Sequence, residues 1–223
     1  MGDSGDFIFR RTEGGGLTWH GDFDGLYRAQ SDPWGQSGEH PRMASYYEYS
    51  RQVLVMHLLG LPWKRLLEAG CGTGHVLHRL SEHLPGRNLH GCDISHTAVE
   101  RAWAKFPRLF FFRLDITAPV EDCHFYRSNY DVAILSQMLW YVMDKLPGVF
   151  ANCARLLTPG GHLIVQAAFL DNQEYGRDIV DGFNGLVRWV LDHAPGWQIV
   201  SASYDASAQH APHHDGILVL RHA

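Results

Sequence analysis

The chain has 223 residues, of which 45% are hydrophobic and 19% charged, and its formal net charge is −5. This composition suits one globular domain with a sizeable core and excludes a disordered chain. Scattered basic residues argue against a nucleic-acid surface, no apolar run could span a membrane, and the four cysteines lack paired spacing. We therefore expect a cytoplasmic protein with free thiols and no nucleic-acid or membrane partner.

The first part of the chain is expected to form an N-terminal arm and lid helices over residues 1–62. Residues 1–25 are rich in Gly and Asp and are predicted to be a loose or lid-like arm. Apolar residues at helical spacing predict a helix over 43–59, which ends before Gly60 and Pro62.

Strands and helices are predicted to alternate through the following core, residues 63–223. The apolar runs lie at 65–69, 88–92, 109–114, 130–135 and 162–168, with helical stretches at 74–84, 96–105 and 144–157. Two more strands, at 197–204 and 216–221, predict a terminal antiparallel hairpin. The expected fold class is therefore α/β, with a Rossmann-like, seven-stranded, doubly wound sheet and an N-terminal helical lid.

A glycine-rich turn follows the first core strand. Glu68 precedes Gly70, Gly72 and Gly74, and a helical pattern begins at His75. Glycines let the backbone approach a ligand, and the helix start offers free N–H groups to an anion. A dinucleotide fingerprint would need glycine where His75 stands. The loop resembles the S-adenosyl-L-methionine (SAM) loop of class I methyltransferases, which would place the methionine carboxylate at the helix start and its ammonium beside Glu68.

Two acidic residues follow the next two strands. Asp93 is expected to accept hydrogen bonds from the ribose hydroxyls, with Ile94 against the adenine. Asp93 could instead cap the helix that follows, although Ser95 could take that role. Asp115 is expected to bind the adenine amino group and Ile116 to offer its backbone N–H; a plain surface loop is the alternative.

The fourth core strand leads into an aromatic turn. Ser136 and Gln137 would lie at its carboxyl edge, with Ser136 at the cofactor and Gln137 at the acceptor. Trp140 and Tyr141 could line an acceptor pocket, or both could be core residues. Asp131 begins this strand, far from the site, which favours a structural role.

Five segments between Leu66 and Ala168 together resemble class I SAM-dependent methyltransferases. The stretches 32–34, 46–51 and 138–142 are similar to those of NodS-like small-molecule methyltransferases. That resemblance implies a lid of N-terminal helices over the cofactor, with Trp34 and Arg51 reaching it.

The resemblance also implies the reaction. We expect methyl transfer from SAM to a nitrogen or oxygen of a small molecule, with an amino sugar or natural-product intermediate favoured, and S-adenosyl-L-homocysteine (SAH) as product. The acceptor would enter between Tyr46 or Tyr47 and Trp140 or Tyr141. Candidate catalytic residues are Tyr141 and His214, with His20, His210 and His213 as other possible bases. No metal is expected, because transfer from a sulfonium needs none.

Two other functions stay open at this stage. One is a SAM-binding fold relative without catalytic activity, and the other is an NAD-dependent oxidoreductase. The identity of the acceptor, the methylated atom and the oligomeric state do not follow from the sequence.

Overall fold

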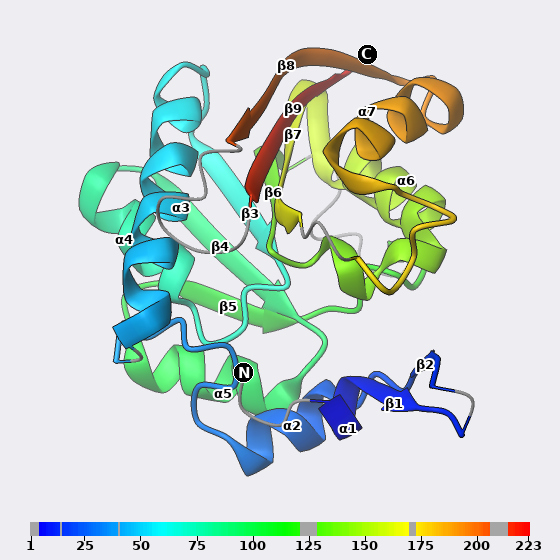
Figure 1. The fold of residues 1–223 in the computed structure, drawn as a ribbon. Coiled ribbons are helices and arrows are strands. Elements are labelled where there is room, and N and C mark those ends of the chain that lie inside the picture. The colour runs from blue at the N-terminus through cyan, green and yellow to red at the C-terminus, as the bar shows by residue number, and fades with distance from the viewer. Residues whose placement is uncertain (1–4, 14, 40, 121–128, 170–172, 206–213) are drawn as a thin grey trace.

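The computed structural model describes residues 5–13, 15–39, 41–120, 129–169, 173–205 and 214–223. Its main sheet has seven strands in the order β5-β4-β3-β6-β7-β9-β8 (Figure 1). The strands are β3 (Arg65–Ala69), β4 (Asn88–Asp93), β5 (Phe110–Arg113), β6 (Tyr130–Ser136), β7 (Leu157–Phe169), β8 (Trp197–Asp205) and β9 (His214–His222). The expected α/β, seven-stranded fold is confirmed.

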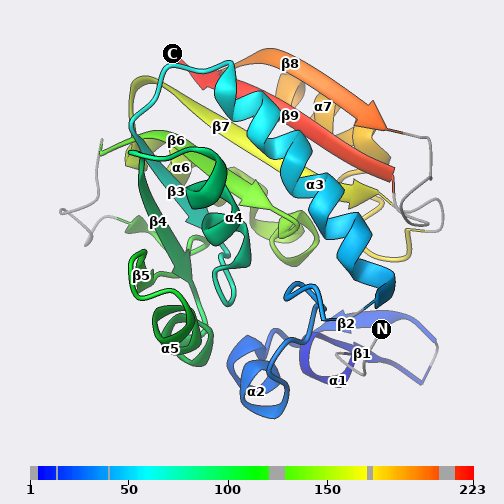
Figure 2. The same ribbon diagram turned by 90° about the vertical axis from the view of Figure 1, so that its left-hand side faces the viewer.

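Helices cover both faces of this sheet. On one face, α3 (Pro41–Leu59), α4 (His75–His83) and α5 (His96–Lys105) bury a cluster that contains Leu54, Leu77 and Ala102 (Figure 2). On the other, α6 (Leu146–Leu156) and α7 (Gly182–His193) bury a second cluster that contains Phe150 and Leu186. No helix among the described residues is both long and apolar enough to cross a membrane.

The C-terminal strands form the expected antiparallel pair, and the last strand, β9, lies between β7 and β8 in the sheet. β9 pairs antiparallel with β7 on one side and with β8 on the other. Pro159, Gly160 and Gly161 lie inside β7, where the pairing with β6 shifts between Tyr130–Leu157 and Val132–His162. The extra residues are therefore accommodated as a bulge.

Regular structure extends into the segment predicted to be a loose arm. It contains α1 (Gly5–Ile8), an antiparallel pair of β1 (Phe9–Arg11) and β2 (Leu17–Trp19), and α2 (Phe23–Ala29). The Asp22 carboxylate caps α2 by accepting a 2.8 Å hydrogen bond from the Gly25 N–H. These elements lie together at one end of the sheet (Figure 2).

Candidate functional site

A cavity of about 200 Å³ opens where β3, β4 and β6 end. Its inner wall is formed at the carboxyl ends of these strands, and its outer wall is formed by residues between Trp19 and Tyr47. The lining residues that the sequence singled out are His20, Trp34, Tyr47, Gly70, Gly72, Asp93, Ile94, Asp115, Ile116, Ser136, Gln137 and Tyr141. The structure thus brings most of the predicted site residues together, while their individual roles stay predictions.

The glycine-rich turn between β3 and α4 forms the floor of this cavity. Gly70 has a φ of 72° and Gly72 a φ of 52°, which is the left-handed region that glycine adopts without strain. The Gly72 N–H donates a 2.8 Å hydrogen bond to Asp93 Oδ2. The turn is therefore tied directly to the end of β4.

Asp93 is buried at the end of β4, and its second oxygen is also engaged. Oδ1 accepts a 2.9 Å hydrogen bond from the Ser95 N–H. Ser95, rather than Asp93, caps α5, because its Oγ accepts from the Ala98 N–H at 3.1 Å. Burial raises the pKa of Asp93. A carboxylate has about four lone-pair positions, so each oxygen keeps acceptor capacity for a ligand.

Next to Asp93 the cavity has an apolar slot with one acid. The Ile94 side chain is 40% exposed although it is apolar, and Leu114 and Ile116 also line the slot. Asp115 Oδ1 accepts hydrogen bonds from the Thr117 N–H at 2.9 Å and from its hydroxyl at 2.7 Å. This arrangement suits a flat ring with a polar edge.

Glu68 and Arg51 lie behind the cavity wall rather than on it. Arg51 Nη2 donates to the Gln36 carbonyl at 2.8 Å, and its guanidinium lies 5.5 Å from the Tyr47 ring centre. Both Gln36 and Tyr47 line the cavity. Glu68 Oε2 and Arg51 Nε are buried and have no hydrogen-bond partner within the described part of the chain. Burial raises the pKa of Glu68 to about 8, against the opposing charge of Arg51.

The end of β6 is held by a buried polar network. Among the described non-glycine residues, Gln137 alone has a positive φ, of 58°. Its amide donates to Asp215 Oδ1 at 3.1 Å, and its Oε1 accepts from the Ala168 N–H at 2.9 Å. The Tyr46 hydroxyl donates to the same Asp215 oxygen at 2.7 Å. Tyr46, predicted to bind the acceptor, is therefore buried in this network and does not line the cavity.

Tyr141 faces an aromatic wall from the N-terminal segment. Its ring centre lies 5.3 Å from that of Trp34, 5.4 Å from Phe23 and 6.4 Å from Trp19. Trp34 Nε1 donates a 3.0 Å hydrogen bond to the Tyr27 hydroxyl. Aromatic faces thus close the cavity on the side opposite the sheet.

Trp140 does not reach this site. Trp140 Nε1 donates to the Ala168 carbonyl at 2.9 Å, and its ring packs at 5.3 Å against Phe169. The prediction that Trp140 lines an acceptor pocket is therefore wrong, because Trp140 is not among the residues that line the cavity. His214 begins β9, but its side chain lies outside what is described. His210 and His213 also lie outside the described residues.

Sequence reasoning missed much of the outer wall. Trp19, Phe23, Tyr27 and Gln36 line the cavity without having been singled out. A signal was present, because an Asp at position 22 precedes apolar residues at 23, 26 and 27, the pattern of a capped helix.

The comparisons with known proteins agree with this geometry. A family model described as a methyltransferase domain matches residues 67–163, from β3 into β7. The N-methyltransferase NodS from Bradyrhizobium japonicum WM9, solved in complex with SAH, superposes with a TM-score of 0.65 at 21% identity. The superposition covers 90% of this chain and 97% of that chain. The chain has the fold of class I SAM-dependent methyltransferases.

Two curated relatives match the chain over part of their own length. Nodulation protein S of Rhizobium tropici is 28% identical over 161 residues, 69% of this chain and 63% of that protein. Squalestatin tetraketide synthase of Phoma sp. (strain C2932) is 28% identical over 165 residues, 70% of this chain and 6% of the synthase. The domain therefore spans under two thirds of the first and a small part of the second. SAM is the cofactor that this class of domain uses.

Proposed function

We propose that this domain transfers the methyl group of SAM to a nitrogen or oxygen atom of a small-molecule acceptor and releases SAH. The observation that carries the proposal is that one cavity joins the glycine-rich turn and Asp93 to an aromatic wall. A nitrogen acceptor, such as an amino sugar or a natural-product intermediate, is favoured because the NodS relative is an N-methyltransferase.

The adenosine end fits the inner wall. Gly70 and Gly72 let the ligand approach the backbone, and Asp93 keeps lone pairs for two ribose hydroxyls. The slot beside Ile94 would hold the adenine ring, with Asp115 accepting from its amino group.

The methionine end would lie against Gln36 and Tyr47, which separate the cavity from Arg51. Arg51 would attract the carboxylate, and Glu68 would balance the ammonium. Each group is costly to bury alone, because a buried polar atom without a partner costs roughly 1–3 kcal/mol. A zwitterionic ligand end would relieve both.

The acceptor end is proposed for the part of the cavity that is bordered by Tyr141 and by the rings of Trp19, Phe23 and Trp34, which pack against Tyr141. The sulfonium supplies an activated methyl group, so the enzyme need only align the nucleophile and exclude water. Aromatic faces do both, and they attract a cation such as a methylated amine product.

A neutral amine acceptor needs no base, but a hydroxyl acceptor does. His20 lines the cavity, and Arg10 Nη2 donates to its Nε2 at 2.8 Å, which occupies the one basic nitrogen of the neutral ring. We propose His20 as the proton acceptor in that case, with Nε2 released from Arg10 when the acceptor binds. Tyr141 would orient the acceptor, and His214 stays an alternative base.

Titration calorimetry with SAM, SAH and NAD is the first test. Micromolar binding of the adenosyl ligands without NAD binding is expected, and Asp93→Ala should abolish it. Asp131→Ala is the matched control, since it removes an acid near the start of β6, at the end of the sheet away from the cavity. Binding of NAD instead would favour the oxidoreductase.

Activity is tested separately, by following label from SAM into a panel of small amines and alcohols. Transfer to an amine would support the favoured acceptor. Tight SAH binding without transfer to any member of the panel would favour the non-catalytic alternative.

A further inference from the structure

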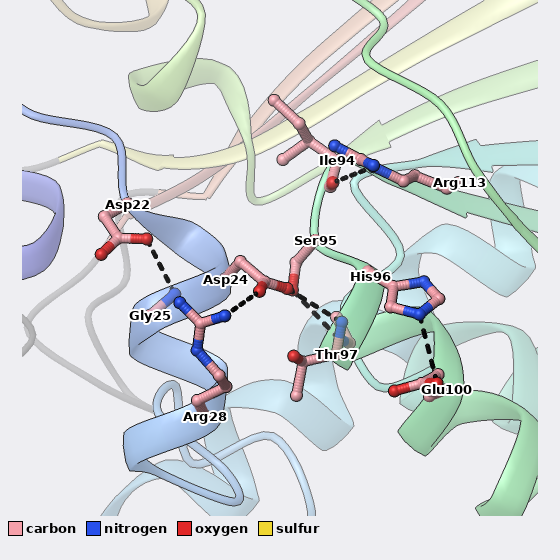
Figure 3. A network of polar contacts seen from close by, with 11 residues as sticks. Asp22, Asp24, Gly25, Arg28, Ile94, Ser95, His96, Thr97, Glu100 and Arg113 are labelled. Atoms are coloured by element: carbon pink, nitrogen blue, oxygen red, sulfur yellow. Dashed lines mark hydrogen bonds and ion pairs between the residues drawn. The ribbon is translucent and has the colours of Figure 1, made fainter.

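The lid helix α2 is fastened to the N-terminus of α5 by one carboxylate. Asp24 Oδ1 accepts hydrogen bonds from Ser95 Oγ at 2.8 Å and from the Thr97 N–H at 2.9 Å (Figure 3). Its Oδ2 pairs with Arg28 at 2.9 Å. These contacts, with the Thr97 N–H foremost, lower the pKa of Asp24 to about 2. Asp24 therefore stays ionised and complements the positive end of α5.

Ser95 links this contact to the proposed ribose site. Its hydroxyl donates to Asp24, while its backbone N–H donates to Asp93 Oδ1 at 2.9 Å. Asp93 in turn accepts from the Gly72 N–H at 2.8 Å. Hydrogen bonds thus run without a break from α2 through Ser95 and Asp93 to the glycine-rich turn.

The same helix forms part of the cavity wall. Phe23 and Tyr27, on either side of Asp24 in α2, both line the cavity. The position of α2 therefore sets the width of the site. A second contact lies at its far end, where Arg101 Nη1 donates to the Gln30 carbonyl at 2.7 Å.

We propose that Asp24 is a positioning residue for the cofactor, which holds α2 closed over the ribose turn through Ser95. This inference rests on the proposed function for the identity of the ligand. If the closed lid favours binding, then binding must favour the closed lid by the same factor. SAH should therefore slow hydrogen exchange of the α2 amides, and loss of Asp24 should weaken SAH binding.

Four variants separate this role from a general loss of stability. Asp24→Ala removes the contact, and Asp24→Asn keeps an oxygen that can accept from Thr97 or Ser95. Arg101→Ala loosens the other end of α2 without touching the path to Asp93. Glu100→Gln is the matched control, since it removes an acid of α5 that pairs only with His96 in Figure 3.

SAH affinity and hydrogen exchange of α2 are measured on each protein. We expect Asp24→Ala to raise the SAH dissociation constant about tenfold, through faster dissociation, and to speed α2 exchange in the ligand-free protein. Asp24→Asn should recover part of the affinity, Arg101→Ala should speed exchange with a smaller effect on affinity, and Glu100→Gln should change neither.

Two results would overturn the proposal: unchanged SAH affinity in Asp24→Ala, or unchanged exchange of α2. If the unaltered protein binds no SAH, then the cofactor assignment fails. Exchange in the ligand-free variants still decides whether Asp24 fastens the helix.

Discussion

The Tyr27 hydroxyl lies directly over Gly72, so that a Cβ built on Gly72 would come within 2.6 Å of it. The lid helix α2 and the glycine-rich turn thus come into contact at the Tyr27 hydroxyl. Since Tyr27 is 4% exposed and its hydroxyl accepts from Trp34, it has little room to move aside.

Gly72→Ala should therefore destabilise the protein and open the lid. The positive φ and the contact with Tyr27 together should cost about 1–3 kcal/mol. Thermal unfolding and SAH titration measure the two effects. Adding Tyr27→Phe removes the hydroxyl and should restore part of the loss; an equal loss in the double variant would place the strain elsewhere.

Glu68 should make stability depend on pH. Its pKa is about 8 in the folded protein against an ordinary 4.5, mainly through burial. The folded state then holds a proton that the unfolded state releases, so this residue lowers stability as pH rises from about 5 to 8. Urea unfolding of Glu68→Gln should show a growing advantage over the unaltered protein across that range. Parallel curves for the two proteins would contradict the raised pKa.

A related prediction concerns the protons exchanged on binding. If the ammonium of the ligand stabilises ionised Glu68, then SAH binding near pH 7 should release a proton from it. The binding enthalpy should then vary with the ionisation enthalpy of the buffer. Glu68→Gln should remove that share of the proton release, whereas an unchanged release would point to another group.

Asp215 should matter more to stability than any one of its donors. It accepts hydrogen bonds from Tyr46, Gln137 and Gln166 in a buried place. Asp215→Ala leaves three donors, two of them buried, without that acceptor and should cost about 3 kcal/mol or more. Tyr46→Phe removes one bond and should cost about 1–2 kcal/mol. Urea unfolding measures the loss of stability in both variants. Equal losses would mean that Asp215 stabilises the protein through Tyr46 alone.

Asp131 should be a purely structural acid. Its Oδ2 accepts from the Lys64 N–H at 2.7 Å and from the Arg65 N–H at 3.0 Å, and so fixes the start of β3. Asp131→Ala should lower stability by about 1–2 kcal/mol without changing SAH affinity. Weaker SAH binding in this variant would contradict a purely structural role for Asp131.

The core and the inner wall of the site were predictable because their signals are local. Apolar runs and the three glycines place β3, the turn and α4, and Asp93 and Asp115 follow the next two strands. Position at a strand end is enough to bring those residues to one edge of a parallel sheet.

The outer wall of the cavity was harder to predict, because its helices and strands are too short to show a periodic pattern of apolar residues. β1 and β2 have three residues each and α2 has seven. Trp140 and Tyr141 illustrate the same limit. They are neighbours in a 3-10 helix at Leu139–Tyr141, so their side chains diverge by about 120°. Only the packing around them decides that one meets Phe169 and the other Trp34.

The inserted position of β9 has a consequence for how the chain folds during synthesis. β8 joins the sheet only through β9, which is made after it. Until residues 214–222 have emerged, β7 presents an open edge to its surroundings and β8 has no place in the sheet. The strand that is translated last among these elements is thus the one that closes the core. A ribosome that stalls just before it would leave a five-stranded sheet with β7 as an aggregation-prone open edge.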